Sequence, residues 1–137
     1  MGRNVLVVDD DAAFRSLARR LLITFGFAPA GEADSVSAAL AVVGSLRPDA
    51  VLVDVGLPDG DGITLAGLLT ALPWHPRVVL TSSDADAATP GDVERSGAAA
   101  FVPKDQLPNA ALHRLLGDSV YMSDSVLGWS RNARRGT

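Results

Sequence analysis

A regular alternation of short aliphatic runs with helical segments leaves few folds open to this chain. The runs are typical of strands buried on both faces of a sheet: NVLVV (4–8), AVLVD (50–54), RVVLT (77–81) and AAFVP (99–103), with a weaker strand near 27–30. Segments with helical spacing separate them, at 12–25, 36–47, 63–72 and 106–116. The alternation predicts an α/β fold in which helices cover both faces of a parallel sheet.

Local residues predict where several helices begin and end. Asp11 and Ser35 are placed to cap the first two helices, and Gly26 follows the first one. Pro90 and Gly91 interrupt the segment 82–97, so a fourth helix there can hardly begin before about residue 91 and should be short. LPDGDG (57–62) is expected to be a loop.

Composition narrows the classes of protein that remain. The chain has 137 residues, 47% of them hydrophobic, which suits one globular domain. Its net charge of −4 disfavours general nucleic-acid binding, so DNA binding is not expected within this chain. There is no cysteine and no apolar run long enough to cross a membrane, and we expect a cytoplasmic protein without a membrane partner.

Polar residues gather at the carboxyl ends of the expected strands. Asp9 and Asp10 follow the first strand, Asp54 ends the third, Thr81 ends the fourth and Lys104 follows the fifth. Open α/β sheets bind ligands at this edge, beside the switch in strand order. Any one of these residues alone could be an ordinary loop residue. Asp54 is harder to dismiss, because an unpaired carboxylate at the end of a buried strand is costly.

A magnesium ion would relieve the repulsion among these carboxylates. Mg²⁺ prefers oxygen ligands in an octahedron and keeps several waters, so few protein ligands suffice. We expect Asp10 and Asp54 to supply carboxylates and Gly56 a main-chain carbonyl, with Asp9 acting directly or through a water. A carboxylate can also attack phosphorus to give an acyl phosphate, and a metal would neutralise charge on the phosphoryl oxygens.

Lys104 is the only lysine among twelve Lys and Arg residues. A compact ammonium on a flexible stem can approach one phosphoryl oxygen where the wide guanidinium of arginine needs more room. The hydroxyl of Thr81 could follow a phosphoryl group in the same way, although a threonine at a strand end is unremarkable by itself.

Four motifs together resemble the receiver domain of bacterial two-component response regulators, the CheY-like family. VLVVDDD matches the acidic pair at Asp9 and Asp10, LVDVGLPDGDG the acceptor strand and loop at Asp54, VVLTSS the hydroxyl at Thr81, and AFVPK the lysine at Lys104. The resemblance covers roughly residues 3–117. It implies a doubly wound, flavodoxin-like sheet of five parallel strands in the order 2-1-3-4-5, flanked by five helices.

The resemblance also implies a function. A histidine kinase or phosphotransfer protein would donate a phosphoryl group to Asp54, and the chain would not be a turnover enzyme, although it could catalyse its own phosphorylation and dephosphorylation. Thr81 would then move inward and Phe101 would follow, changing the face built by the fourth helix, fifth strand and fifth helix. An unidentified downstream protein would read that face, and a homodimer through it stays open. The alternative is that Phe101 is an ordinary core or edge aromatic.

Some features depart from the family pattern. Asp105 follows Lys104 where many members have proline, so we expect a trans peptide bond there and a weaker hold on phosphate. Gly56 is small and should leave water open access to the acceptor. We expect a receiver domain at 1–117, with residues 118–137 forming a tail and no output domain.

Two other classes of protein share parts of this pattern. A haloacid-dehalogenase-type phosphatase also uses a strand-end aspartate, Mg²⁺, a hydroxyl and a lysine. Its first motif needs Thr or Val after Asp-x-Asp, whereas Ala12 and Ala13 follow Asp11 here. The remaining alternative is a receiver-like module that binds proteins without ever being phosphorylated.

Overall fold

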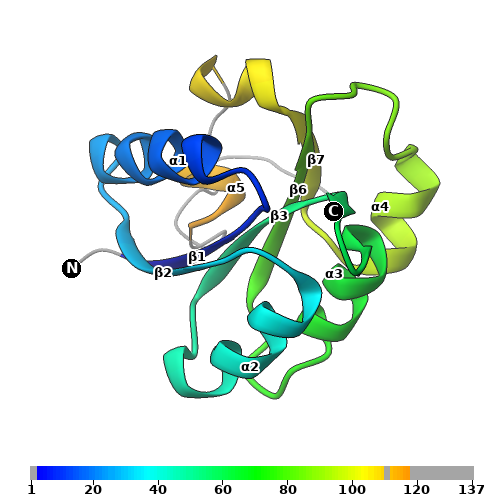
Figure 1. Ribbon diagram of the computed structural model, residues 1–137, viewed down its shortest axis with the longest axis horizontal. Coiled ribbons are helices and arrows are strands. Elements are labelled where there is room, and N and C mark those ends of the chain that lie inside the picture. Colours follow the sequence, from blue (N-terminus) through cyan, green and yellow to red (C-terminus); the bar gives the residue numbers. More distant parts are fainter. Residues whose placement is uncertain (1–2, 110–111, 118–137) are drawn as a thin grey trace, which may run out of the picture.

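A five-stranded parallel sheet forms the centre of the molecule. The computed structural model describes residues 3–109 and 112–117. The strand order is β2-β1-β3-β6-β7 (Figure 1), where β6 and β7 are the fourth and fifth strands of this sheet, so the predicted order 2-1-3-4-5 is confirmed. The strands are β1 (Asn4–Val8), β2 (Ala28–Ala33), β3 (Ala50–Asp54), β6 (Arg77–Ser82) and β7 (Ala100–Pro103).

Helices cover both faces of the sheet and create two separate hydrophobic cores. In sequence order the helices are α1 (Ala12–Thr24), α2 (Val36–Leu46), α3 (Gly62–Thr70), α4 (Pro90–Ser96) and α5 (Leu112–Leu115). Side chains of α1 and α5 pack against one face, together with alternate residues of the strands such as Val5 and Val7. Helices α2, α3 and α4 cover the other face (Figure 1), and their side chains pack there with Leu6 and Val8. Strand residues alternate between the two cores because successive side chains point to opposite faces.

The capping residues lie where the sequence predicts them. The Asp11 carboxylate accepts hydrogen bonds from the main-chain N–H groups of Ala13 and Phe14 at the start of α1. Ser35 accepts one from Ala38 at the start of α2. Both caps pair N–H groups that have no partner within the helix. Gly26 follows α1 at a φ of 88°, a conformation that costs glycine little.

The predicted loop at 57–62 contains a small hairpin. Gly56–Leu57 (β4) and Gly60–Asp61 (β5) pair in antiparallel fashion around Pro58 and Asp59. The Asp59 carboxylate reaches out of this turn and accepts hydrogen bonds from the main-chain N–H groups of Val36 (2.7 Å) and Ser37 (3.0 Å). The segment beside Asp54 is thereby tied to the first turn of α2.

Helix α4 is short, as predicted, and begins with Pro90 at its first position. Proline is well tolerated there because its missing N–H would have had no partner. Thr89 and Asp92 form a capping box: Thr89 accepts from the Asp92 N–H, and Asp92 accepts from the Thr89 N–H. The start of α4 at Pro90 therefore agrees with the prediction that this helix begins no earlier than about residue 91.

The prediction of one helix over 106–116 is wrong. Lys104–Asn109 forms a 3-10 helix (η1) and α5 covers only Leu112–Leu115. Pro108 lies within η1 and lacks the N–H that an α-helix would need. The described residues contain no cis peptide bond, which agrees with the trans bond expected between Lys104 and Asp105. The tail 118–137 lies outside the described residues.

Two hydrophobic residues of the first helical stripe are more exposed than that spacing suggests. Leu17 is 45% and Phe25 38% exposed, whereas Phe14, Ala18 and Leu22 are buried. The buried residues recur every fourth position and define a narrow stripe along α1. Within the described part of the chain, no helix is both long enough and apolar enough to cross a membrane.

Candidate functional site

Three carboxylates converge at the carboxyl edge of the sheet. Asp9 follows β1 and is fully buried, Asp54 is the last residue of β3 and is 7% exposed, and Asp10 is exposed. One oxygen from each lies within 4.8 Å of the others. Because β1 and β3 are adjacent and parallel, their ends bring these side chains together, as the sequence predicts.

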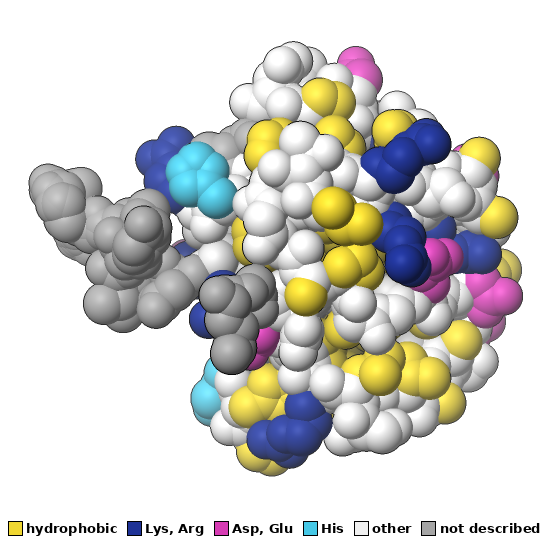
Figure 2. Space-filling view, turned by 90° about the vertical axis from the view of Figure 1, so that its left-hand side faces the viewer, with side chains coloured by type: hydrophobic (Ala, Val, Ile, Leu, Met, Phe, Trp, Pro, Cys, Tyr) yellow, Lys and Arg dark blue, Asp and Glu magenta, His cyan; other side chains and the backbone are white. Residues whose placement is uncertain are grey.

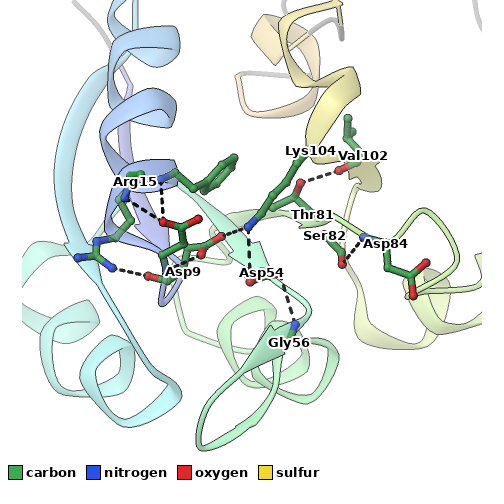
Figure 3. Close-up of polar contacts among 12 residues, drawn as sticks. Asp9, Arg15, Asp54, Gly56, Thr81, Ser82, Asp84, Val102 and Lys104 are labelled. Atoms are coloured by element: carbon green, nitrogen blue, oxygen red, sulfur yellow. Dashed lines mark hydrogen bonds and ion pairs between the residues drawn. The ribbon is translucent and has the colours of Figure 1, made fainter.

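Lys104 reaches into this cluster from the start of η1. Its Nζ lies 2.8 Å from Oδ2 of Asp9 and 3.8 Å from Oδ2 of Asp54 (Figure 3). The side chain is 19% exposed, so the ammonium is largely removed from water. A fully buried carboxylate requires such a partner. The lone lysine therefore neutralises Asp9 first and lies within reach of Asp54.

Arg15 holds the main chain at Asp9 in place, and the sequence analysis does not identify this arginine as a site residue. Its Nη1 donates a 2.6 Å hydrogen bond to the main-chain carbonyl of Asp9, and its Nε donates to Oε1 of Glu32 at 2.9 Å. The main-chain N–H of Asp11 in turn donates to Oδ1 of Asp9. A signal was available, since Glu32 is one of only two glutamates and follows the predicted strand at 27–30.

The environment of Asp54 disfavours its charged form. Burial raises the pKa of Asp54 above its ordinary value of 3.8, and the neighbouring Asp9 carboxylate raises it further. Lys104 and a hydrogen bond from the Gly56 N–H to Oδ1, long at 3.4 Å, lower the pKa but do not cancel that effect. The carboxylate is thus held in place with little stabilisation of its charge.

Thr81 lies beside Asp54 but its hydroxyl is turned elsewhere. The two residues are paired in register on β6 and β3. The buried Thr81 hydroxyl donates a 2.7 Å hydrogen bond to the main-chain carbonyl of Val102 on β7 (Figure 3). Thr81 therefore links the strand beside the acidic cluster to the edge strand that carries Phe101 and leads to Lys104.

Phe101 is half-buried on the α4 side of the sheet. With Ala88, Thr89, Pro90, Val93 and Glu94 it lines a shallow groove of about 370 Å³ between α4 and β7. The ring also packs against the core beneath α3 and α4. Phe101 is thus partly a core residue and partly the floor of an open groove.

The donor set of the acidic cluster fits a divalent cation. Three carboxylates within one ligand sphere supply hard oxygen atoms, and the raised pKa of Asp54 means that added positive charge would stabilise its ionised form. Both Asp9 oxygens already have protein partners, in Asp11 and Lys104. Asp10 and Asp54 are therefore the carboxylates best placed to face a cation directly.

Comparison with known proteins gives the same class. The family model of the response regulator receiver domain matches residues 5–116. The DNA-binding transcriptional activator DevR/DosR of Mycobacterium tuberculosis is 41% identical over 106 residues, which cover 74% of this chain and 47% of that protein. The chemotaxis protein CheY of Thermotoga maritima is 27% identical over 115 residues, covering 84% of this chain and 96% of that protein.

Solved structures agree. The signal receiver domain of the putative response regulator NarL from Mycobacterium tuberculosis superposes with a TM-score of 0.67 at 30% identity, over 79% of this chain and 88% of that one. The receiver domain of Klebsiella pneumoniae RstA superposes with a TM-score of 0.70 at 30% identity, over 82% of this chain and 94% of that one.

With this fold, this cluster at the sheet edge and these matches, the chain belongs to the response regulator receiver domain family of two-component signalling. Members of that family act as phosphoacceptor switches, and the matched span, residues 5–116, runs from β1 to the residue after α5. The chain spans about half the length of some curated relatives, 48% in one case and 47% in another.

Proposed function

We propose that Asp54 is the phosphoacceptor of a signalling switch. The observation that carries the proposal is its position: a nearly buried carboxylate at a strand end, with a raised pKa, a second acid beside it and Lys104 within 3.8 Å. A carboxylate whose pKa is shifted by burial and by a neighbouring charge is typical of reactive sites. The receiver unit would span residues 1–117.

The chemistry follows from the carboxylate and its neighbours. An Asp54 oxygen attacks phosphorus, a P–O bond forms, and the bond from phosphorus to the donor breaks, leaving an acyl phosphate. Lys104 then offers an ammonium to one phosphoryl oxygen. Bound Mg²⁺, held by Asp10, Asp54 and the Gly56 carbonyl and touching Asp9 directly or through water, would supply charge neutralisation during the transfer.

The proposed donor is a histidine kinase or phosphotransfer protein, and the proposed place of the exchange is the cytoplasm. The reader of the signal would be another protein. Among the described side chains on the face shown in Figure 2, basic groups lie dispersed among acidic and hydrophobic ones. Together with the net charge of −4, this mixture favours a protein partner over DNA for this chain.

Thr81 and Phe101 would carry the change to the surface. If the Thr81 hydroxyl turns to a phosphoryl oxygen on Asp54, its bond to the Val102 carbonyl is lost. Val102 is adjacent to Phe101, whose ring lines the groove beside α4 and would move with this change. The switch is then a local charge change that biases a packing element.

Intact-mass measurement tests the acceptor. With Mg²⁺ and a small-molecule phosphodonor, the wild type should gain one phosphoryl group and Asp54→Ala none. Asp105→Asn, which changes an exposed acid next to Lys104, serves as the matched control and should still be phosphorylated. Lys104→Arg should gain the group while losing the phosphorylation-dependent change in Trp fluorescence or partner binding.

The second candidate is a protein-binding module that is never phosphorylated. It would show no mass gain under any condition and no response to Mg²⁺. A phosphatase of the haloacid-dehalogenase type would instead release phosphate continuously. The paired buried carboxylates with a lysine counter-ion favour the switch, because a pure binding module has no need to maintain them.

A further inference from the structure

We propose that Phe14 is a positioning residue for Lys104. Phe14 is the third residue of α1, directly after the turn that carries Asp9 and Asp10. The Lys104 Nζ lies over its ring, 4.2 Å from the ring centroid. An ammonium over an aromatic face is attracted by the negative charge density of the ring, most strongly where water is excluded.

The ring is held firmly by the fold. Phe14 is 8% exposed and belongs to the core between α1, α5 and the sheet. Leu107 of η1 lies in the same core, three residues after Lys104. The ring and the backbone that carries Lys104 are therefore anchored to one packed layer, and the ring face cannot follow the ammonium if it moves.

The ammonium accordingly occupies a site with two fixed attractions. The Phe14 ring lies at 4.2 Å and Oδ2 of Asp9 at 2.8 Å, while Oδ2 of Asp54 is more distant at 3.8 Å. With the Lys104 side chain only 19% exposed, water screens these contacts weakly. Phe14 thus helps to hold Lys104 against Asp9 in the unphosphorylated protein.

This placement affects the switch, and here the inference rests on the proposed function. A phosphoryl group on Asp54 draws the ammonium towards Asp54 and away from the ring. The ring contact is then lost or lengthened, so Phe14 stabilises the resting state over the phosphorylated one. Cation–π contacts of partly desolvated ammonium groups correspond to roughly two- to thirtyfold in an equilibrium constant.

The single lysine allows a direct test in the unphosphorylated protein. Lysine labelled with ¹³C and ¹⁵N gives one set of side-chain NMR signals, and the ring should shift the Lys104 Hε resonances upfield. Phe14→Leu should abolish that shift, whereas Phe14→Tyr should keep it. Phe27→Leu is the matched control, since Phe27 is 9% exposed in the same core but directly precedes β2, at the amino ends of the strands and away from the acidic cluster. An Hε shift that survives Phe14→Leu would overturn the proposal.

A second measurement tests the consequence. Beryllofluoride with Mg²⁺ mimics the phosphoryl group on an aspartate. Phe14→Leu should tighten its binding by roughly two- to thirtyfold, and the same substitution in a Lys104→Met background should change it by less than about twofold. An equal change in both backgrounds would show that Phe14 does not act through Lys104. If the wild type binds no beryllofluoride, the proposed function fails, and the NMR experiment alone decides whether Phe14 positions Lys104.

Discussion

Asp54 is the residue at which stability and function conflict most directly. Burial and the neighbouring Asp9 raise its pKa, so ionising it costs free energy that the unfolded chain does not incur. Between the ordinary value of 3.8 and the raised folded value, the folded state binds more protons. Stability therefore falls as pH rises through that interval and stays lower above it.

Asp54→Asn should consequently stabilise the metal-free protein. At neutral pH we expect its midpoint of thermal unfolding to exceed that of the wild type by several degrees, because the neutral amide avoids the cost of ionisation. The difference should shrink as pH falls towards 3.8 and vanish below it. Thermal unfolding in a chelating buffer across this range measures both effects. A variant less stable than the wild type at neutral pH would contradict this account.

Gly56 offers a test of water access to the acceptor. It is exposed, and a Cβ built on it meets no atom within 4 Å, so a larger side chain can be accommodated without rearrangement. Gly56→Met should place an apolar side chain beside Asp54 and slow hydrolysis of the acyl phosphate severalfold. The decay of phosphorylated protein, followed by intact mass, measures the rate. Gly44→Met, equally unobstructed but on α2, is the control, and an unchanged decay rate in Gly56→Met would refute the idea.

Among the elements, the β4–β5 hairpin matters because Asp59 joins it to α2. Hydrogen bonds from the N–H groups of Ser37 and Val36 hold the pKa of Asp59 below its ordinary value of 3.8. Its contribution to stability is therefore complete above 3.8 and is lost as pH falls through the lowered folded pKa.

Asp59→Ala should lower the unfolding midpoint by a few degrees at neutral pH, since two N–H groups lose their acceptor. The difference from the wild type should narrow in acid, opposite in sign to the effect of Asp54→Asn. Asp59→Asn keeps one acceptor oxygen and should fall between the two proteins. Thermal melts at neutral and acid pH measure this difference. If it does not change with pH, the ionised Asp59 carboxylate is not what stabilises the start of α2.

The elements differ in how well the sequence predicts them. The sequence correctly predicts the strands at 4–8, 50–54 and 77–81 and the caps at Asp11 and Ser35, because buried aliphatic runs and capping side chains act locally. Its prediction of one helix at 106–116 is wrong, since Pro108 and the packing of Leu107 favour a tighter turn. It does not predict the hairpin, because two-residue strands carry no periodicity.

Within the site, too, the sequence predicts some features and not others. The convergence of Asp9, Asp10, Asp54 and Lys104 follows from strand topology, which the sequence predicts. The direction of the Thr81 hydroxyl and the contact of Phe14 with Lys104 depend on side-chain rotamers and packing. Such details arise only when two elements distant in sequence meet.

At the scale of the whole molecule, a divalent cation should stabilise the fold. A ligand that binds only the folded state adds about 2.7 kcal/mol at roughly a hundredfold excess over its dissociation constant. MgCl₂ should therefore raise the unfolding midpoint. Asp10→Asn should reduce the rise, because Asp10 belongs to the cluster but has no ion-pair partner among the described residues. NaCl at equal ionic strength is the control. An equal rise with both salts would indicate screening and no bound cation.

Successive side chains of β7 point to opposite faces of the sheet. Ala100 and Val102 face the core of α1 and α5, whereas Phe101 faces the core of α3 and α4. A rearrangement at Phe101 therefore acts directly on the side of α3 and α4. We expect that an upstream partner docking on α1, across the sheet from Phe101, would not compete for binding with a downstream protein that binds beside α4.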